Sequence, residues 1–416
     1  MINTYQLYQQ YADATDPLRA SARMLVPVFG VEWPGLPANP LMRKLASACD
    51  VFARTQLTHA RPDFDIPNVE DGGRTIAVHE EVVAATPFCS LLRFRKDARK
   101  DLRKETLEEQ PKVLVVAPMS GHFATLLRGT VKTLLRHHDV YITDWHNARD
   151  ISLEHGKFGL DEYVSHVISF LGVLGPGAHL LAVCQPTVAA LTAAAVMAED
   201  DNPAQPRTMT LMAGPLDTRV NPTAVNALAK SKPIEWFEKN MISTVPARHR
   251  GAGRRVYPGF VQLAAFMNMN LNRHVDAFRN LYRHLVDGED EKAAQIQTFY
   301  EEYFAMSDLP AEFYLETVRA VFQEHALPLG KLQYQGRVVK PAAIRRTALF
   351  TIEGEKDDIC AVGQTVAAQE MCSGIRPYMR LHHVQTAVGH YGVFNGRRWD
   401  NEIYPRLRDF INMHHR

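Results

Sequence analysis

The sequence lacks long apolar runs, a secretion signal and an excess of charge of either sign. No run reaches the roughly 18 uncharged apolar residues that a bilayer-spanning helix needs, and the N-terminus has no basic segment followed by an apolar core. The 47 basic and 46 acidic side chains leave a net charge of +1, so no general attraction to nucleic acid or anionic lipid is expected. These absences favour a cytoplasmic protein with no transmembrane segment and no nucleic-acid partner.

Cysteine is also scarce. The five cysteines stand at positions 49, 89, 184, 360 and 372, an odd number without CxxC spacing, which argues against a disulfide framework and against a zinc site. No other cluster of metal-ligating residues is evident, so we expect neither a metal nor a tightly bound cofactor. With 46% hydrophobic and 22% charged residues, the composition is that of an ordinary globular protein.

The order of the expected elements indicates an α/β architecture. Residues 1–70 have mostly helical spacing, and from residue 71 short strands begin, with a strand pair at 74–95. Strands and helices then alternate to residue 217 and again over 341–416, which implies a mostly parallel central sheet flanked by helices. Residues 218–340 are mostly helical and rich in aromatic side chains, which indicates an inserted helical cap or lid, or else a separate helical domain.

One cysteine lies where a nucleophile is expected. The stretch HLLAVCQPTVAAL, residues 179–191, places Cys184 between an apolar strand and a helix. In α/β-hydrolases the nucleophile occupies such a turn, at the N-terminus of a helix. A free cysteine is also among the most often buried residue types, so Cys184 by itself would pass for a core residue. The usual elbow, G-x-S-x-G, has glycines where this chain has Ala182 and Pro186.

The partners that a thiol nucleophile needs follow later in the chain. Asp357 and Asp358 come just after the strand pattern TALFTIEGE, and His390 lies between Gly389 and Gly392 after the next strand. The order nucleophile, acid, histidine is that of α/β-hydrolases. Each of these residues also has an ordinary interpretation: either aspartate could be a solvated loop charge, and the histidine could be a hydrogen-bonded surface or core residue. The sequence pattern does not decide which of the two aspartates would orient the histidine.

A further loop has the position of an oxyanion hole. After the strand KVLVVAP the chain reads MSGHFATLL, and hydrolases use the backbone of such a loop to bind the oxyanion. We therefore expect Met119, Ser120 and Gly121 to contribute there, together with the N–H of Gln185, which follows the nucleophile. His122 is expected to hydrogen-bond substrate or, equally, to cap the following helix.

Four segments carry a resemblance to a known family. VAPMSGHFATLLRGT, DVYITDWHNARD, AVCQPTVAAL and VGHYGVFNGRRW closely resemble the intracellular polyhydroxybutyrate depolymerases of polyester-storing bacteria, over nearly the whole chain. The resemblance implies an α/β-hydrolase fold with Cys184 as nucleophile, Asp357 as orienting acid and His390 as general base. It favours Asp357 over Asp358 because the related polyester synthases carry a D-x-I pattern that KDDI matches at Asp357.

The resemblance also implies a reaction. The thiolate attacks an ester of stored poly(3-hydroxybutyrate), a thioester acyl-enzyme forms, and water releases 3-hydroxybutyrate or oligomers, or coenzyme A takes the acyl group as a thioester. Association with polyester granules in the cytoplasm is implied as well. The alternatives are a polyhydroxyalkanoate synthase-like acyltransferase, although synthase elbows carry glycines that this one lacks, and a non-catalytic granule-binding protein. Chain-length preference, hydrolysis against thiolysis and assembly into a homo-oligomer stay open.

Overall fold

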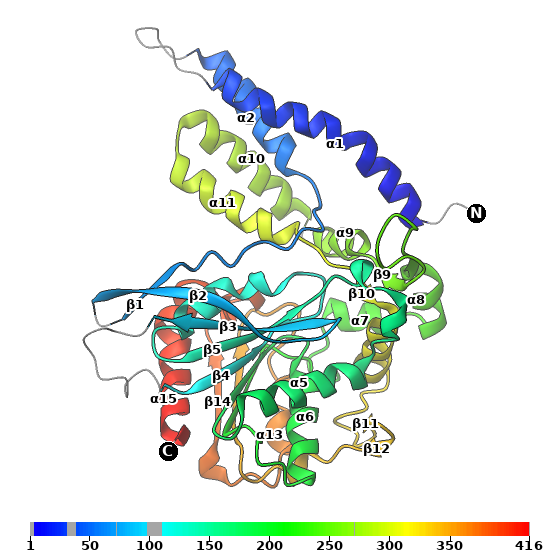
Figure 1. Ribbon diagram of the computed structural model, residues 1–416, viewed down its shortest axis with the longest axis vertical. Coiled ribbons are helices and arrows are strands. Elements are labelled where there is room, and N and C mark those ends of the chain that lie inside the picture. The colour runs from blue at the N-terminus through cyan, green and yellow to red at the C-terminus, as the bar shows by residue number, and fades with distance from the viewer. Residues whose placement is uncertain (1–3, 31–38, 72, 98–109, 270, 416) are drawn as a thin grey trace.

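The computed structural model describes residues 4–71, 73–97, 110–269 and 271–415 apart from 31–38, and its central feature is a twisted sheet (Figure 1). Among the described residues nine strands form this sheet, in the order β1-β2-β3-β5-β4-β6-β7-β13-β14. The strands are β1 (Asn68–Asp71), β2 (Arg74–Ala85), β3 (Cys89–Lys96), β4 (Lys112–Val116), β5 (Asp139–Trp145), β6 (His179–Val183), β7 (Thr208–Met212), β13 (Ala348–Gly354) and β14 (Arg380–Gln385).

The pairing of neighbouring strands changes once across the sheet, from antiparallel to parallel. β1, β2, β3 and β5 pair antiparallel in succession, and all pairs from β5 to β14 are parallel. An antiparallel edge followed by parallel strands, with β5 placed outside β4, is the strand order of the α/β-hydrolase fold. β6, β7 and β13 are buried along their whole length, which explains why their sequences are nearly continuous apolar runs.

The first strand begins shortly before the boundary expected at residue 70. β1 begins at Asn68, inside the segment predicted to be helical, because Asp71 pairs with Arg74 across a tight turn. Gly73 has a φ of +77° in that turn, a conformation that glycine adopts without strain. The turn therefore converts the end of the N-terminal segment into an edge strand.

Helices cover both faces of the sheet. The described helices of this layer are α4 (Arg128–Leu134), α5 (Leu160–Leu174), α6 (Thr187–Glu199), α13 (Ala368–Met371), α14 (Gly396–Arg398) and α15 (Tyr404–His415). α6 is rich in alanine and buried through most of its length, which lets it pack closely against both the sheet and α5. The helix that starts at the elbow is thus among the most enclosed elements of the core.

Between β7 and β13 the chain forms a layer of helices over the carboxyl edge of the sheet. It contains α7 (Ala224–Lys230), α8 (Ile234–Met241), α9 (Gly259–Met269), α10 (Leu271–Asp287), α11 (Asp290–Tyr303), α12 (Ala311–Thr317), a π-helix (Val318–Gln323) and the short strands β8 (Ser243–Thr244), β9 (Arg255–Tyr257) and β10 (Leu309–Pro310). Glu302 of α11 accepts a hydrogen bond from Thr125 at 2.7 Å and pairs with Arg128 at 2.6 Å, which ties the layer to the core. That residues 218–340 act as a cap stays a prediction.

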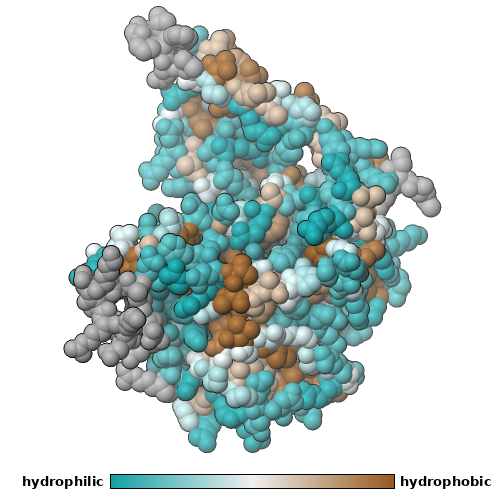
Figure 2. Space-filling model, viewed as in Figure 1, coloured by the Kyte–Doolittle hydropathy of each residue, from teal (hydrophilic) through white to brown (hydrophobic). Residues whose placement is uncertain are grey.

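Of the two N-terminal helices, α2 (Pro40–Arg54) packs on α10 and α11, and α1 (Thr4–Phe29) packs on α2, away from the sheet (Figure 1). The buried Tyr5 donates a hydrogen bond to Asp308 at 2.5 Å, which anchors the start of α1. At the outer end of the pair, apolar side chains gather on the surface (Figure 2), among them Met24, Val28 and Leu41 with exposures of 60% or more. None of the described helices is both long and apolar enough to span a membrane.

Candidate functional site

Cys184 occupies a strained turn directly after β6. Its φ is +67°, in the left-handed region that a non-glycine residue enters at a cost of about 1–3 kcal/mol. The Cys184 N–H donates to the carbonyl of Met212 at 2.8 Å, and the Cys184 carbonyl accepts from the Thr187 N–H at 3.2 Å and hydroxyl at 2.9 Å. These bonds hold the strained residue in place at the start of α6.

At the usual elbow, glycines let the backbone of the turn pack closely against its neighbours. In this chain the glycine that allows such close packing is Gly214, which follows the neighbouring strand β7. A Cβ at Gly214, in the loop after β7, would lie 1.9 Å from the Thr187 hydroxyl oxygen, so only glycine fits against the first turn of α6. Pro186, which precedes that turn, has a φ of −67°, a value suited to the start of a helix. Sequence reasoning missed Gly214, and the only signal for it was its position after an apolar strand.

His390 and Asp357 form a buried pair. The Nδ1 atom of His390 lies 2.7 Å from Oδ2 of Asp357, while Oδ1 of Asp357 accepts the N–H groups of Ile359 at 2.9 Å and Cys360 at 2.8 Å. Asp358 is exposed. The structure therefore brings Asp357, not Asp358, to the histidine. Because Nδ1–H donates to the carboxylate, Nε2 is left to face the thiol.

The surroundings of His390 favour its protonated form. Burial alone would lower the pKa of His390, but the negative charges of the Cys184 thiolate and Asp357, with hydrogen bonds to both, raise that pKa well above its usual value. An imidazolium beside a thiolate is the charge state that a cysteine nucleophile requires. The predicted nucleophile, base and acid thus meet at the carboxyl ends of β6, β13 and β14.

The predicted oxyanion loop lies beside the elbow. The N–H of Met119 points at the side-chain oxygen of Gln185 over 3.4 Å, a long and weak hydrogen bond. Gly121 has a φ of +108°, and its carbonyl accepts the Ser307 N–H at 2.6 Å, so the helical layer clamps this loop. The half-buried Ser120 lines the same cavity as these residues.

His122 is buried and does not cap a helix. The next helical turn has Phe123 as its N-cap residue and no side-chain cap, so the capping role considered for His122 is wrong. Its ring instead packs against Phe266 and Tyr303, with ring centres 5.5 and 5.4 Å apart. Burial lowers the pKa of His122 to about 4, and its Nε2 atom has no hydrogen-bond partner among the described residues. His122 is therefore neutral at neutral pH, and its Nε2 atom is unsatisfied although the ring also hydrogen-bonds the backbone of Tyr303.

Cys184 and His390 line a cavity of about 230 Å³ between the core and the helical layer. Its other lining residues include Met119, Gln185, Tyr257, Phe266, Phe313, Tyr314, Val318, Phe322 and Phe394. Of the described residues that line it, none is Lys, Arg, Asp or Glu. The space beside the thiol thus suits a neutral, largely apolar group.

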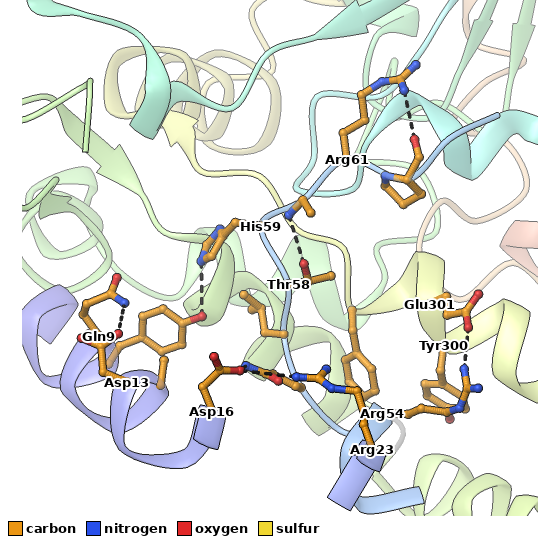
Figure 3. Close-up of a pocket in the computed structure, with 18 of the residues that line it drawn as sticks. Gln9, Asp13, Asp16, Arg23, Arg54, Thr58, His59, Arg61, Tyr300 and Glu301 are labelled. Atoms are coloured by element: carbon orange, nitrogen blue, oxygen red, sulfur yellow. Dashed lines mark hydrogen bonds and ion pairs between the residues drawn. The ribbon is translucent and has the colours of Figure 1, made fainter. Parts of the chain in front are cut away.

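A larger cavity of about 730 Å³ lies elsewhere, between α1, the segment after α2, and α11 (Figure 3). Its charged side chains already pair with one another: Arg54 with Glu301 at 2.6 Å, and Arg248 with Asp13 at 2.6 Å. The His59 in its wall holds the Tyr8 hydroxyl at 3.3 Å. Among the described residues, neither a cysteine nor a serine lines this cavity.

Comparison with known proteins identifies a family. Residues 213–415 match the family described as PHB de-polymerase C-terminus. No curated protein sequence matches the chain.

Solved structures with a similar arrangement share little sequence with it. A 2-hydroxy-6-oxo-6-phenylhexa-2,4-dienoate hydrolase from Rhodococcus sp. strain RHA1 is 11% identical, over 81% of this chain and 100% of that one, with a TM-score of 0.43. A meta-cleavage product hydrolase from Pseudomonas fluorescens IP01 is 14% identical, over 83% and 97% of the two chains, with a TM-score of 0.40. The family match and the order of the strands together support an ester hydrolase.

Proposed function

Because residues 213–415 belong to the PHB depolymerase C-terminal family, we propose that this protein cleaves ester bonds of poly(3-hydroxybutyrate) through Cys184, His390 and Asp357. The observation that carries the proposal is the buried pair of His390 and Asp357, 2.7 Å apart, whose histidine lines the same largely apolar cavity as Cys184. Cysteine, rather than serine, would be the nucleophile.

The reaction takes two steps. The Cys184 thiolate attacks the ester carbonyl, a carbon–sulfur bond forms, and the carbonyl electrons move to its oxygen. When the oxyanion collapses, the carbon–oxygen ester bond breaks and the leaving alcohol takes the proton that His390 held. The thioester is then attacked by water, which gives a proton to His390, and a second collapse releases the hydroxyacid and the thiolate.

Backbone donors stabilise the oxyanion. The Gln185 N–H lies at the start of α6 and donates to no protein group within the described parts of the chain. The Met119 N–H is held only by the long bond to the Gln185 side chain, which a substrate oxygen would replace. A donor of this kind contributes about 3–4 kcal/mol to transition-state stabilisation.

The acyl side of the substrate occupies the cavity around Cys184. An aliphatic polyester is neutral and flexible, and this cavity is lined by apolar and aromatic side chains without formal charge in its described part. The unpartnered Nε2 of His122 accepts a hydrogen bond from a hydroxyl group of the substrate. The helical layer of residues 218–340 acts as the cap that excludes bulk water from the thioester.

The test is incubation of the purified protein with native amorphous polyhydroxybutyrate granules, with and without coenzyme A, followed by mass spectrometry. We expect release of 3-hydroxybutyrate or short oligomers, abolished in Cys184→Ala and retained in the control Cys49→Ala. A hydroxybutyryl-coenzyme A product would make the reaction thiolytic. No release, but polymer growth from hydroxybutyryl-coenzyme A, would replace the depolymerase by a synthase.

Residence on granules, in the cytoplasm, is part of the same proposal. The exposed apolar side chains at the outer end of α1 and α2, such as Met24 and Val28, support it because they offer a surface for an apolar polymer. Sedimentation of the protein with polymer granules, compared with Met24→Glu/Val28→Glu, tests it: equal co-sedimentation of both would refute a role for this surface.

A further inference from the structure

A second cavity, of about 380 Å³, adjoins the one around Cys184. The two share a short stretch of wall that includes His390 and Tyr391, and Cys184 lines only the first. The general base therefore stands at the junction of the two spaces, and the thiol stands on one side of it.

This arrangement assigns the two halves of an ester to the two cavities. The acyl half is bonded to Cys184 after the first step, so it must stay in the first cavity. The leaving oxygen must reach Nε2 of His390, the atom beside the thiol, so only the rest of the alcohol can extend past His390 and away from Cys184. The second cavity is lined by His390 but not by Cys184 and has the required position.

The chemistry of the polymer then determines which chemical group of the substrate enters the second cavity. In a chain of 3-hydroxyacid units, the segment that leaves as an alcohol is the one that runs toward the carboxyl end. If that segment is short, it carries a free carboxylate. A leaving-group site for short segments should therefore hold cations, whereas a site for a long neutral polymer needs none.

The second cavity holds such cations. Arg273 of α10 and Lys356 of the loop after β13 line it, and both are exposed. Within the described part of the chain neither forms an ion pair within 4.0 Å, although Asp358 lines the same space. Two cations against one carboxylate leave this cavity with an excess positive charge, whereas no Lys, Arg, Asp or Glu lines the described wall of the cavity around Cys184.

We propose that Arg273 and Lys356 bind the terminal carboxylate of the leaving segment, so that the enzyme releases short hydroxyacids from the carboxyl end of a chain or oligomer. This specificity rests on the proposed function, because it presupposes that His390 protonates the leaving alcohol. A carboxylate bound by two exposed cations gains a modest, salt-sensitive affinity.

The experiment compares two substrates with the same scissile bond, the 3-hydroxybutyrate dimer as free acid and the same dimer as its carboxyl methyl ester. For the wild type at low salt we expect kcat/KM to be about 3- to 30-fold higher for the acid, as two exposed ion pairs would give, with the preference shrinking as salt is added. Arg273→Gln and Lys356→Gln should each raise KM for the acid, leave kcat unchanged and leave the methyl ester unaffected.

Arg279→Gln is the matched control, because Arg279 lies on the same helix, is exposed, and pairs with Asp276 at 3.3 Å. It should keep the acid preference of the wild type. Cleavage of both dimers with equal kcat/KM in the wild type, or an unchanged preference in both variants, would overturn this inference alone. Cleavage of neither dimer by protein that still releases product from granules would also overturn this inference alone, whereas no cleavage of dimers or granules would overturn the proposed function as well.

Discussion

Replacement of Asp357 by Asn is expected to disable the nucleophile while leaving the fold intact. Oδ1 of Asp357 accepts two backbone N–H groups, from Ile359 and Cys360, so an Asn side chain must keep its oxygen there. Its NH2 group then faces Nδ1 of His390, where the carboxylate oxygen lay at 2.7 Å. A donor now meets a donor, and the imidazole must change tautomer so that Nδ1 accepts. Nδ1 can then no longer carry a proton as well, so the imidazolium that stabilises the Cys184 thiolate is disfavoured.

The size of the effect follows from the lost interaction. A hydrogen bond to a charged group contributes about 1.5–3 kcal/mol, which alone is about 10- to 150-fold in rate. The wrong tautomer costs more, about 10⁴-fold in kcat for the equivalent substitution in a serine protease. We therefore expect a loss of at least about 100-fold in kcat with little change in KM.

The substitution should also make the protonated form of His390 less stable. The carboxylate of Asp357 is one of the groups that raise the pKa of His390, so its neutralisation lowers that pKa. The imidazolium is then lost at a lower pH, and the alkaline limb of the rate profile shifts to lower pH.

Two assays measure these effects of Asp357→Asn on catalysis and on the thiolate. Hydrolysis of a short neutral ester reports catalysis, and the rate at which iodoacetamide alkylates Cys184, followed by peptide mass spectrometry from pH 5 to 9, reports the thiolate without any substrate. Asp358→Asn tests the alternative that the sequence left open, and its effect on both assays should be at least tenfold smaller. Equal losses in the two variants, or unchanged alkylation in Asp357→Asn, would refute the reasoning.

Three further predictions concern the clamp on the oxyanion loop, the substrate hydroxyl and the anchor of α1. Gly121→Ala forces a Cβ to within 2.4 Å of Gln262 Oε1 and 2.5 Å of Met306 Cε at a φ of +108°, so we expect a stability loss of about 1–3 kcal/mol and reduced activity; an unchanged denaturation midpoint would contradict this. His122→Phe keeps the ring packing but removes an acceptor, so KM should rise about 2- to 12-fold for hydroxyacyl esters and not for butyryl esters, and equal effects would exclude the contact. Burial raises the pKa of Asp308 from 3.8 to about 6, so the native state binds this proton more tightly and loses stability as pH rises through that interval, by about 3 kcal/mol in all. In Asp308→Asn the slope of the melting temperature over that interval should flatten, and a slope equal to that of the wild type would contradict the assignment.

Local sequence was most informative where an element is buried on both faces. β6, β7 and β13 are mostly apolar because parallel strands in the middle of the sheet meet helices on each side. The hairpin of β2 and β3 was also readable from its alternating pattern. The short β1 was not, because its pairing depends on the turn at Gly73 and on the strand beyond it.

Some features of the candidate site could likewise be predicted from the sequence, and others could not. The sequence order of Cys184, the aspartate pair and His390 already indicated a hydrolase, because side chains at the ends of parallel strands meet at one edge of the sheet. It could not separate Asp357 from Asp358, since adjacent residues in a loop differ only in where the backbone aims them. Nor could it assign His122, whose buried contacts with Phe266 and Tyr303 come from distant parts of the chain.

The sequence by itself therefore determined the kind of sheet, the position of the elbow and the chemical types gathered at its edge, because these depend on local periodicity and on chain order. Only the tertiary structure decided which aspartate faces His390, how the helical layer encloses Cys184, and that Arg273 and Lys356 line the cavity on the far side of His390. Those features depend on contacts between segments far apart in the chain, and no local pattern of residues encodes them.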